Sequence, residues 1–412
     1  MSKKSNFNNG IGTSRSAVIE AILEGGPMSR SDLASKMNVA KSAITEISHD
    51  LVQTGLLHEV SVVRNSLRKG RPSVLLSLNA DRGCFLGVDL ADSPRAMMLT
   101  DLLGTNLGEC EIAGNGNPEA VVESMHRGIQ RITRPLQGSA REILGVGIAV
   151  SGFVNHASGV CVYSAALDWH DVPIGELVAQ SLGIPTYVDN DANAVAIAEK
   201  LFGEARELRN FSVVVLGANV GCAHYIDGQI YRGANSGAGE IGHMLAMPNG
   251  LQCRCGRQGC LDTVAGSEAI LVAAREASLP VNDLKDLEAL ATKGNSQAIA
   301  ILRNAGEALG LAVASIIQLN NPEFILFANV AGFDNGLFTV TTRQTIENNI
   351  LPRFLASTRI LFHHVQPSFL APGAACIAAH KFLFEQTGRQ GNLVNKTDKI
   401  RDFLTDRLAG CG

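Results

Sequence analysis

The twenty residues from 243 to 262, HMLAMPNGLQCRCGRQGCLD, hold one histidine and three cysteines in a chain that otherwise uses cysteine sparingly. The cysteines follow the spacing C-x-C-x4-C, so three thiolates can surround one cation and the histidine can supply a fourth ligand. Four protein ligands of this kind close a tetrahedral zinc site and leave no position for a reactive water; three unligated thiols or a redox pair are the alternatives. The stretch predicts a structural Zn²⁺ ion bound by His243, Cys253, Cys255 and Cys260.

Two acidic residues flank this cluster. Glu240 lies three positions before His243, and Asp262 follows Cys260 by two positions. A closed metal site would hold such acids in place beside a binding site without reacting itself. Taken singly, each acid is more often a capping or surface residue.

The composition predicts a soluble protein of two or three domains. A length of 412 residues exceeds one ordinary core, and 46% hydrophobic with 18% charged residues is typical of globular proteins. We find no run of the roughly eighteen uninterrupted apolar residues that a membrane span needs, and no apolar core behind the basic N-terminus of the kind a secretory signal has. Nine cysteines, six of them isolated, favour a reducing compartment, so we expect a cytoplasmic protein without membrane association.

Charge separates the first 80 residues from the rest. They carry ten Lys and Arg against six Asp and Glu, whereas the remainder carries 25 against 33. Helical spacing of apolar residues in 16–23, 29–37 and 40–57 predicts three short helices in the order of a helix-turn-helix. The second helix of that motif presents its N-terminal residues to the major groove, so Lys41, Ser42 and Thr45 are predicted DNA contacts.

Two alternating runs, 56–63 and 73–79, predict a hairpin like that of a winged helix. The joining segment RNSLRKGRP contains Arg68, Lys69 and Arg71, and its Gly and Pro keep it extended. Such a segment suits the narrow minor groove of A·T-rich DNA, where the negative potential is strongest. The alternative is a solvated tip, but behind a helix-turn-helix we favour DNA contact.

From about residue 83 the sequence alternates short apolar strands with amphipathic helices. This pattern predicts an α/β fold, with two lobes and a ligand cleft between them. The expected domains are residues 1–80, 81–192, 193–385 with the last helix returning to the first lobe, and a polar tail of 386–412. Expected strands are 84–90, 96–102, 142–150, 185–191, 211–217, 222–228 and 323–330; expected helices are 118–132, 193–203, 267–277 and 297–320.

The stretch VDNDANAVAIAEK, residues 188–200, places Asp189, Asn190 and Asp191 between a strand and a helix. A polar turn there commonly caps the helix. Asn and Asp side chains are also what a sugar site requires, since each can hydrogen-bond neighbouring hydroxyls.

Three strings, NDANA at 190–194, GAGEIGH at 237–243 and CRCGRQGCLD at 253–262, closely resemble the ROK family of repressors, open reading frames and sugar kinases. The resemblance extends over residues 14–385. It implies an N-terminal winged helix-turn-helix followed by a two-lobed, actin-like (ribonuclease H-like) sugar-kinase fold. Residues 145–178 resemble the sugar-facing part of the xylose-responsive repressors, and the chain as a whole also resembles the N-acetylglucosamine-type repressors.

By this resemblance one set of residues contacts a sugar: Asn190, Asp191, Glu240, His243 and Asp262. His243 and the three cysteines would bind zinc. Asp191 matches the base that activates the sugar hydroxyl in kinase members. At position 262 the chain departs from the family, because most members have Glu there.

The nucleotide-binding turns of the family's kinases are altered in this chain. In the first turn, D-x-G-G-T, Asp89 remains, but Ala91, Asp92 and Ser93 replace the glycines and threonine. Ala218, Asn219 and Cys222 occupy the second turn, G-T-G-x-G-G, and Ala328 with Asn329 replace the paired glycines of the third. Phosphoryl transfer depends on positioning and charge stabilisation of the phosphates, so these changes predict a protein that binds sugar without phosphorylating it and has no catalytic residue.

We therefore expect a sugar-responsive, DNA-binding transcriptional regulator, and specifically a repressor of carbohydrate uptake or catabolism genes. A homodimer or higher oligomer is expected, because two-fold proteins match palindromic operators. Two alternatives are kept: an ATP-dependent sugar kinase with a DNA-binding domain, and a regulator controlled by a partner protein.

Overall fold

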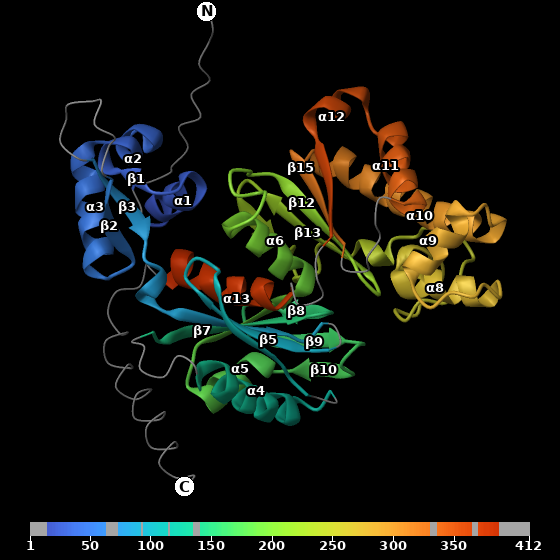
Figure 1. The fold of residues 1–412 in the computed structure, drawn as a ribbon, viewed down its shortest axis with the longest axis horizontal. Helices are drawn as coiled ribbons and strands as arrows, with labels where there is room; N and C mark the ends of the chain where they lie inside the picture. Colours follow the sequence, from blue (N-terminus) through green and yellow to red (C-terminus); the bar gives the residue numbers. More distant parts are fainter. Residues whose placement is uncertain are drawn as a thin grey trace, which may run out of the picture.

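The computed structural model describes residues 15–62, 73–91, 94–113, 116–134, 141–329, 336–364 and 370–386. Within these residues the chain forms two five-stranded and two three-stranded sheets, with helices around and between them (Figure 1). We call residues 15–78 the N-terminal unit, residues 84–190 lobe 1 and residues 191–364 lobe 2. The mixed α/β fold expected from the sequence is confirmed.

The N-terminal unit has three helices and a small sheet of strand order β1-β3-β2. Ile19, Leu33, Ile44 and Leu51 are fully buried at its centre. The loop between β2 and β3, which holds the three basic residues expected to contact DNA (Arg68, Lys69 and Arg71), lies outside the described residues. The elements are α1 (Arg15–Gly25), β1 (Met28–Ser29), α2 (Arg30–Met37), α3 (Lys41–Gln53), β2 (Leu57–Val62) and β3 (Ser73–Leu78).

Lobe 1 contains a sheet of order β11-β7-β4-β5-β6, in which β4, β5 and β6 are antiparallel and β7 and β11 are parallel to β4. A short turn, η1 (Ala80–Arg82), leads into it, and a small sheet of order β10-β9-β8 lies beside it. The strands are β4 (Cys84–Asp89), β5 (Ala96–Asp101), β6 (Asn106–Glu111), β7 (Ile143–Val150), β8 (Phe153–Asn155), β9 (Val160–Ser164), β10 (Trp169–Val172) and β11 (Thr186–Asn190). The helices are α4 (Pro118–Thr133) and α5 (Ile174–Leu182).

Lobe 2 repeats this strand arrangement. Its sheet has the order β14-β13-β12-β15-β16, with β12, β13 and β14 antiparallel and β15 and β16 parallel to β12. The strands are β12 (Phe211–Leu216), β13 (Val220–Ile226), β14 (Gln229–Tyr231), β15 (Phe324–Asn329) and β16 (Arg359–His364). The helices are α6 (Asp191–Leu201), α7 (Asp262–Ala265), α8 (Ser267–Glu276), α9 (Leu284–Thr292), α10 (Ser296–Asn320), α11 (Leu337–Asn349) and α12 (Pro352–Ser357).

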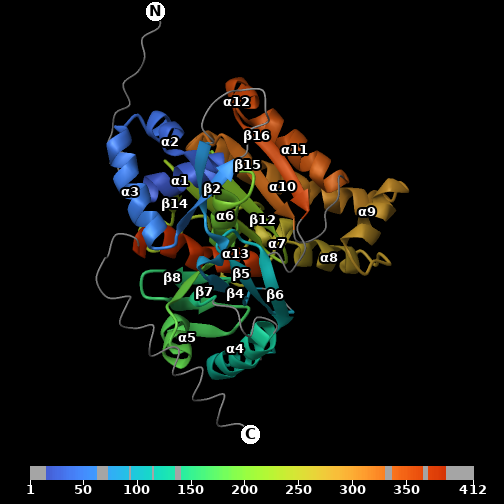
Figure 2. The ribbon, with the colours of Figure 1, turned by 60° about the vertical axis from the view of Figure 1, so that its left-hand side comes forward.

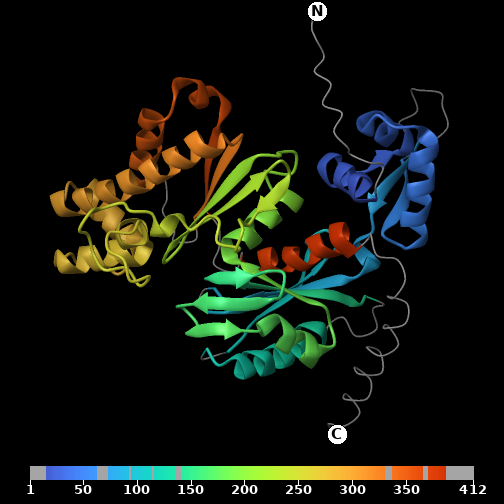
Figure 3. The ribbon, with the colours of Figure 1, turned by 180° about the vertical axis from the view of Figure 1, so that it is seen from behind.

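Helices α6 and α13 (Leu370–His380) form a layer between the two sheets (Figure 3). Helix α13 packs on β4 and β7, and it comes close because these strands present glycines. A Cβ atom on Gly147 would lie 1.8 Å from the carbonyl oxygen of Ala374, and one on Gly87 would lie 2.0 Å from that of Ala371. The return of the last helix to lobe 1 thus depends on two residues without side chains. A turn of π-helix, η5 (Lys381–Gln386), follows α13.

Helix α10 is, within the described part of the chain, long and apolar enough to cross a membrane by length and composition alone. It instead packs in the core of lobe 2, where Leu302, Leu309, Val313 and Ile317 are fully buried. Its apolar character is therefore that of a core helix.

The strands and helices expected from the sequence are all present, but the structure adds others. Among the missed elements are β6, β16 and α12, which are short or carry polar residues. In β6 the sequence is NLGECE and only part of each side chain is buried, so the apolar signal of a core strand is absent.

Candidate functional site

The segment 243–262 folds into a compact loop after the short helix η3 (Ile241–His243). Leu245 pairs with Cys260 across the loop, and the backbone N–H groups of Ala246 and Met247 both donate to the carbonyl of Gly259, at 2.8 and 3.0 Å. Gly259 has a φ of 73°, and a Cβ atom there would lie 1.8 Å from the carbonyl oxygen of Met247. Glycine is thus required where the loop turns back on itself.

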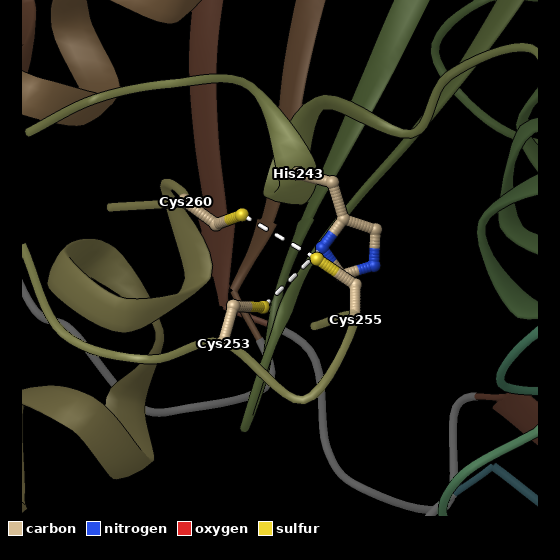
Figure 4. A group of neighbouring side chains, drawn as sticks. All are labelled: His243, Cys253, Cys255 and Cys260. Atoms are coloured by element: carbon tan, nitrogen blue, oxygen red, sulfur yellow. Dashed lines mark hydrogen bonds between the residues drawn. The ribbon is translucent and has the colours of Figure 1, made fainter. Parts of the chain in front are cut away.

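The loop brings His243 and the three cysteines together, and Figure 4 shows their side chains pointing toward a common centre. The Sγ atoms of Cys255 and Cys260 are 3.6 Å apart, Cys253 Sγ lies 3.6 Å from His243 Nδ1, and all four ligand atoms lie within 4.8 Å of one another. A tetrahedral zinc ion with bonds of about 2.3 Å to sulfur and about 2.0 Å to nitrogen separates its ligand atoms by roughly 3.5–3.8 Å. The donor set and its spacing therefore fit zinc.

The thiols of this group differ in acidity. The backbone amide of Arg257 lowers the pKa of Cys255 to about 7, whereas burial and the neighbouring thiols raise the pKa of Cys260 to about 12. Three thiolates this close repel one another unless a cation lies between them. The arrangement is suited to a metal ion rather than to free thiolates.

His243 connects the cysteine group to a carboxylate. Its Nδ1 faces Cys253, while its Nε2 lies 3.9 Å from Oε2 of Glu240. Burial lowers the pKa of His243, so the ring is held in the neutral form that a metal ligand needs, and burial followed by the nearby Asp262 raises the pKa of Glu240. A metal on Nδ1 would leave Nε2 available for a ligand beside Glu240.

Asp262 is nearly buried, and its carboxylate already has partners within the protein. Oδ1 accepts a 2.8 Å hydrogen bond from the backbone N–H of Val220, and Oδ2 lies 3.7 Å from Arg254. The close approach of Gly242 leaves no space for a side chain there, since a Cβ atom would lie 2.4 Å from Asp262 Oδ1. The sugar contact expected of Asp262 stays a prediction, and the bonds seen here tie the metal loop to the turn between β12 and β13.

Asn190 and Asp191 stand where β11 ends and α6 begins. Asn190 caps the helix by accepting from the backbone N–H of Ala192, and its Nδ2 donates to the carbonyl of Gly152 at 3.1 Å. Asp191 occupies the first helical position and also accepts from the N–H of Ala192. Both side chains lie at the junction of the two lobes.

An ion pair that the sequence did not reveal supports this junction. Asp189 is almost fully buried, and its Oδ2 accepts hydrogen bonds from Nη2 and Nε of Arg232, at 2.6 and 3.1 Å. Arg232 begins the segment that leads from β14 to Glu240, and Ser236 in the same segment lies 3.2 Å from Nδ1 of His156 in lobe 1. The segment carrying Glu240 is thus fixed to both sides of the junction.

Hydrogen bonds within the chain are seen at two of the altered nucleotide turns. Asp89 accepts a 2.8 Å hydrogen bond from the backbone N–H of Ala91, and Asp92 and Ser93 lie outside the described residues. In the second turn, the N–H of Gly217 donates to the carbonyl of Asn219, and the carbonyl of Gly217 accepts from Ser267. At the third turn, Ala328 is buried in β15, one residue before the strand ends.

The predicted DNA contacts Lys41, Ser42 and Thr45 are exposed at the N-terminal end of α3, as the helical pattern required. Lys41 and Thr45 border a hollow of roughly 360 Å³ that Ser31 at the start of α2 also lines. Sequence reasoning did not place Ser31 beside them, because its position there depends on how α2 packs against α3. Arg30 lines the same hollow but is held by Glu59 of β2 at 2.8 Å, so it braces the hairpin against the helices.

The fold and the site together define the class of protein: residues 85–381 match the ROK family, and the chain belongs to that family. Its relatives include the xylose repressor of Bacillus spizizenii (strain ATCC 23059 / NRRL B-14472 / W23), 26% identical over 89% of this chain and 94% of the relative. The N-acetylglucosamine regulator NagC of Escherichia coli (strain K12), a DNA-binding transcriptional dual regulator, is 27% identical over 76% of this chain and 79% of its own length. The resemblance to both repressor types is confirmed.

Solved structures agree. A ROK family transcriptional regulator that is a homologue of the E. coli MLC protein matches with a TM-score of 0.77 and 28% identity, over 92% of this chain and 99% of that one. A ROK family glucokinase from Streptomyces griseus shares the fold with a TM-score of 0.63 and 23% identity, over 72% of this chain and 100% of that one. The match to the regulator covers a larger share of this chain than the match to the kinase does.

Proposed function

We propose that this protein is a sugar-responsive transcriptional repressor of carbohydrate uptake or catabolism genes, acting in the cytoplasm without membrane association. One observation carries the proposal: a unit of three helices and a small sheet, with Lys41, Ser42 and Thr45 exposed at the start of α3, is joined to ROK lobes in which several glycines of the phosphate turns are replaced. The named repressor relatives support it.

In this proposal residues 1–80 form a winged helix-turn-helix that binds operator DNA, and 81–192 with 193–385 form the two sugar-binding lobes. Residues 386–412 are a polar tail, of which 387–412 lie outside the described residues. Two copies would place their α3 helices in successive major grooves of a palindromic operator, which is why a homodimer or higher oligomer is part of the proposal.

The sugar would bind at the junction of the lobes. Asn190 and Asp191 would accept and donate hydrogen bonds from the first turn of α6, while Glu240 and Nε2 of His243 would face them from the metal loop. A zinc ion bound by His243, Cys253, Cys255 and Cys260 would have four protein ligands. It would hold the loop in place and would have no open position for a reactive water. The chain's own residues thus orient His243 and Glu240 for hydroxyl recognition.

The operator interface yields a first prediction. Arg68→Ala with Arg71→Ala should weaken operator binding roughly tenfold, most at A·T-rich flanks, because the pair would lose its minor-groove contacts. Each lost phosphate contact should also reduce the log–log salt slope by about one unit. A gel-shift titration at several salt concentrations measures both, with Arg127→Ala on the far lobe as control. An unchanged titration would rule out the wing as a DNA contact.

The absence of phosphoryl transfer is a second prediction. With ATP and a panel of sugars, a coupled ADP-release assay should show no sugar-dependent turnover, because the phosphate turns lack the bare backbone that cradles phosphate. Sugar-dependent ADP release would establish instead the ATP-dependent sugar kinase with a DNA-binding domain, whose fold this chain shares.

The proposal as a whole is tested by a gel shift on DNA upstream of the chain's own gene, with D-xylose, D-glucose and N-acetylglucosamine added separately. We expect one sugar to change operator affinity. If none does, and none raises the melting temperature of the protein, a partner protein rather than a sugar controls the regulator.

A further inference from the structure

Helix α6 reaches from the sugar-site residues to the N-terminal unit. Its first turn holds Asn190 and Asp191, and its last turn holds Lys200. Eleven residues at about 1.5 Å of rise each make the helix roughly 15 Å long. A helix packed on both sides moves as one rigid element, so a displacement of its first turn also displaces its last turn.

Lys200 connects α6 to α1. Its ammonium group is nearly buried and donates to the carbonyls of Arg206 and Leu208, at 2.7 and 3.2 Å. The same nitrogen lies 3.7 Å from Oε1 of Glu24 and 3.9 Å from Oε1 of Glu20, both on α1. A buried ammonium group such as that of Lys200 needs negative charge nearby. Glu20 and Glu24 of the N-terminal unit supply part of it.

Apolar packing accompanies this ionic contact. Val18, Ile19 and Ile22 of α1 belong to the same buried cluster as Tyr225 of β13 and Leu383 of η5. In Figures 1 and 2, α1 is the helix of the N-terminal unit that faces α6 and α13. Because α1 also packs against α3, a shift of α1 changes the position of the helix that carries Lys41.

The buried cluster that includes the side chains of α1 also contains the hydroxyl of Tyr225. Tyr225 stacks on Phe211, and within the described residues its hydroxyl has no hydrogen-bond partner. Burial is the main cause that raises the pKa of Tyr225, with Arg232, Asp189 and Glu20 among the charges acting on it. A buried hydroxyl without a partner costs free energy, and this one lies in the same buried cluster as the side chains of α1.

We propose that the contact of Lys200 with Glu20 and Glu24 couples sugar binding to DNA binding. Sugar held by Asn190 and Asp191 shifts the first turn of α6, and Lys200 carries that shift to α1. The inference rests on the proposed function and names the residues through which that function would be regulated. Lys200 is a positioning residue, since it touches neither sugar nor DNA.

The test compares Lys200→Met with Lys36→Met. Methionine keeps most of the apolar stem and removes the charge, and Glu20 and Glu24 remain 41% and 21% exposed, so they can be hydrated when Lys200 is replaced. Lys36 also pairs with Glu24, at 2.9 Å, but lies within the N-terminal unit and is the matched control. Because Lys200→Met also removes two bonds to the 206–208 segment, a Glu20→Gln, Glu24→Gln variant breaks the contact from the other side.

Operator affinity of the full chain is measured by fluorescence anisotropy with and without the active sugar of the panel, and sugar affinity by calorimetry without DNA. In wild type and Lys36→Met we expect the same sugar-induced change in operator Kd. In Lys200→Met and in the double Gln variant we expect that change to shrink at least fivefold, with sugar Kd altered less than twofold. Combining the Met and Gln changes should add nothing further, because they break one contact.

Two results are decisive against the proposal. A responsive wild type, with folded Lys200→Met and Gln variants that respond equally well, would overturn the link while leaving the proposed function intact. A wild type whose operator affinity no sugar changes would overturn the proposed function, and the link with it.

Discussion

Cys255→Ser should yield a protein that purifies with less than one zinc ion per chain and whose operator affinity no longer responds to sugar. The Sγ atom of Cys255 lies 3.6 Å from that of Cys260, at the spacing of a tetrahedral site, so its loss opens the closed ligand set. Without the metal, the imidazole of His243 would lose the bond that fixes its orientation beside Glu240. Metal analysis of the purified protein and a gel shift with sugar measure the two effects.

Cys110→Ser is the matched control, since Cys110 is half-buried in β6 and belongs to no such group. It should keep one zinc ion and the full response. Metal binding should also weaken as pH falls, because protons compete with the metal for the thiolates. Stoichiometric zinc absent from the wild-type protein, or a full sugar response in Cys255→Ser, would refute the structural role given to the metal.

Gly147→Ala should lower the free energy of unfolding by about 3 kcal/mol or more. The added Cβ atom would lie 1.8 Å from the carbonyl oxygen of Ala374, which belongs to the backbone of α13 and cannot rotate away. The helix must therefore move off β7, which loosens the layer between the sheets. Urea unfolding followed by circular dichroism measures the change.

Gly145→Ala provides the comparison in the same strand. Its nearest neighbour would be the Cβ of Ala378 at 3.2 Å, so a shift of a few tenths of an ångström suffices and we expect a loss of about 1 kcal/mol or less. Equal stability of the two variants would mean that α13 does not depend on the glycines of β7.

The sequence predicts best where the determining residues are close together. The metal group spans eighteen positions, from His243 to Cys260, so its members could be predicted from their spacing in one short segment. The face of α3 that carries Lys41 and Thr45 follows from the period of Ile44 and Leu51 in the same helix.

Contacts between distant residues could not be predicted. Asp189 and Arg232 are separated by 43 positions, and Val220 and Asp262 by 42, so no local pattern reveals that they pair. The carboxylate of Asp262 was expected to face a sugar, and the structure shows that a backbone N–H and Arg254 also attract it. Which of these residues can contact one another is determined by the arrangement of the two sheets, which no local sequence pattern specifies.

Within the described residues, the N-terminal unit contacts both lobes and also η5, where the Ser16 hydroxyl donates to the carbonyl of Phe384 at 3.4 Å. The chain enters lobe 1 through η1, where Arg82 donates to the carbonyl of Thr54 at 3.1 Å and Arg141 pairs with Asp81. Helix α1 rests against lobe 2 through Lys200. Because the N-terminal unit contacts both lobes, it cannot move rigidly with either lobe alone. If the lobes closed, the unit would rotate relative to each of them. In the homodimer that we propose, closure of the lobes around a sugar would change the spacing of the two α3 helices, which would then no longer match the pitch of DNA.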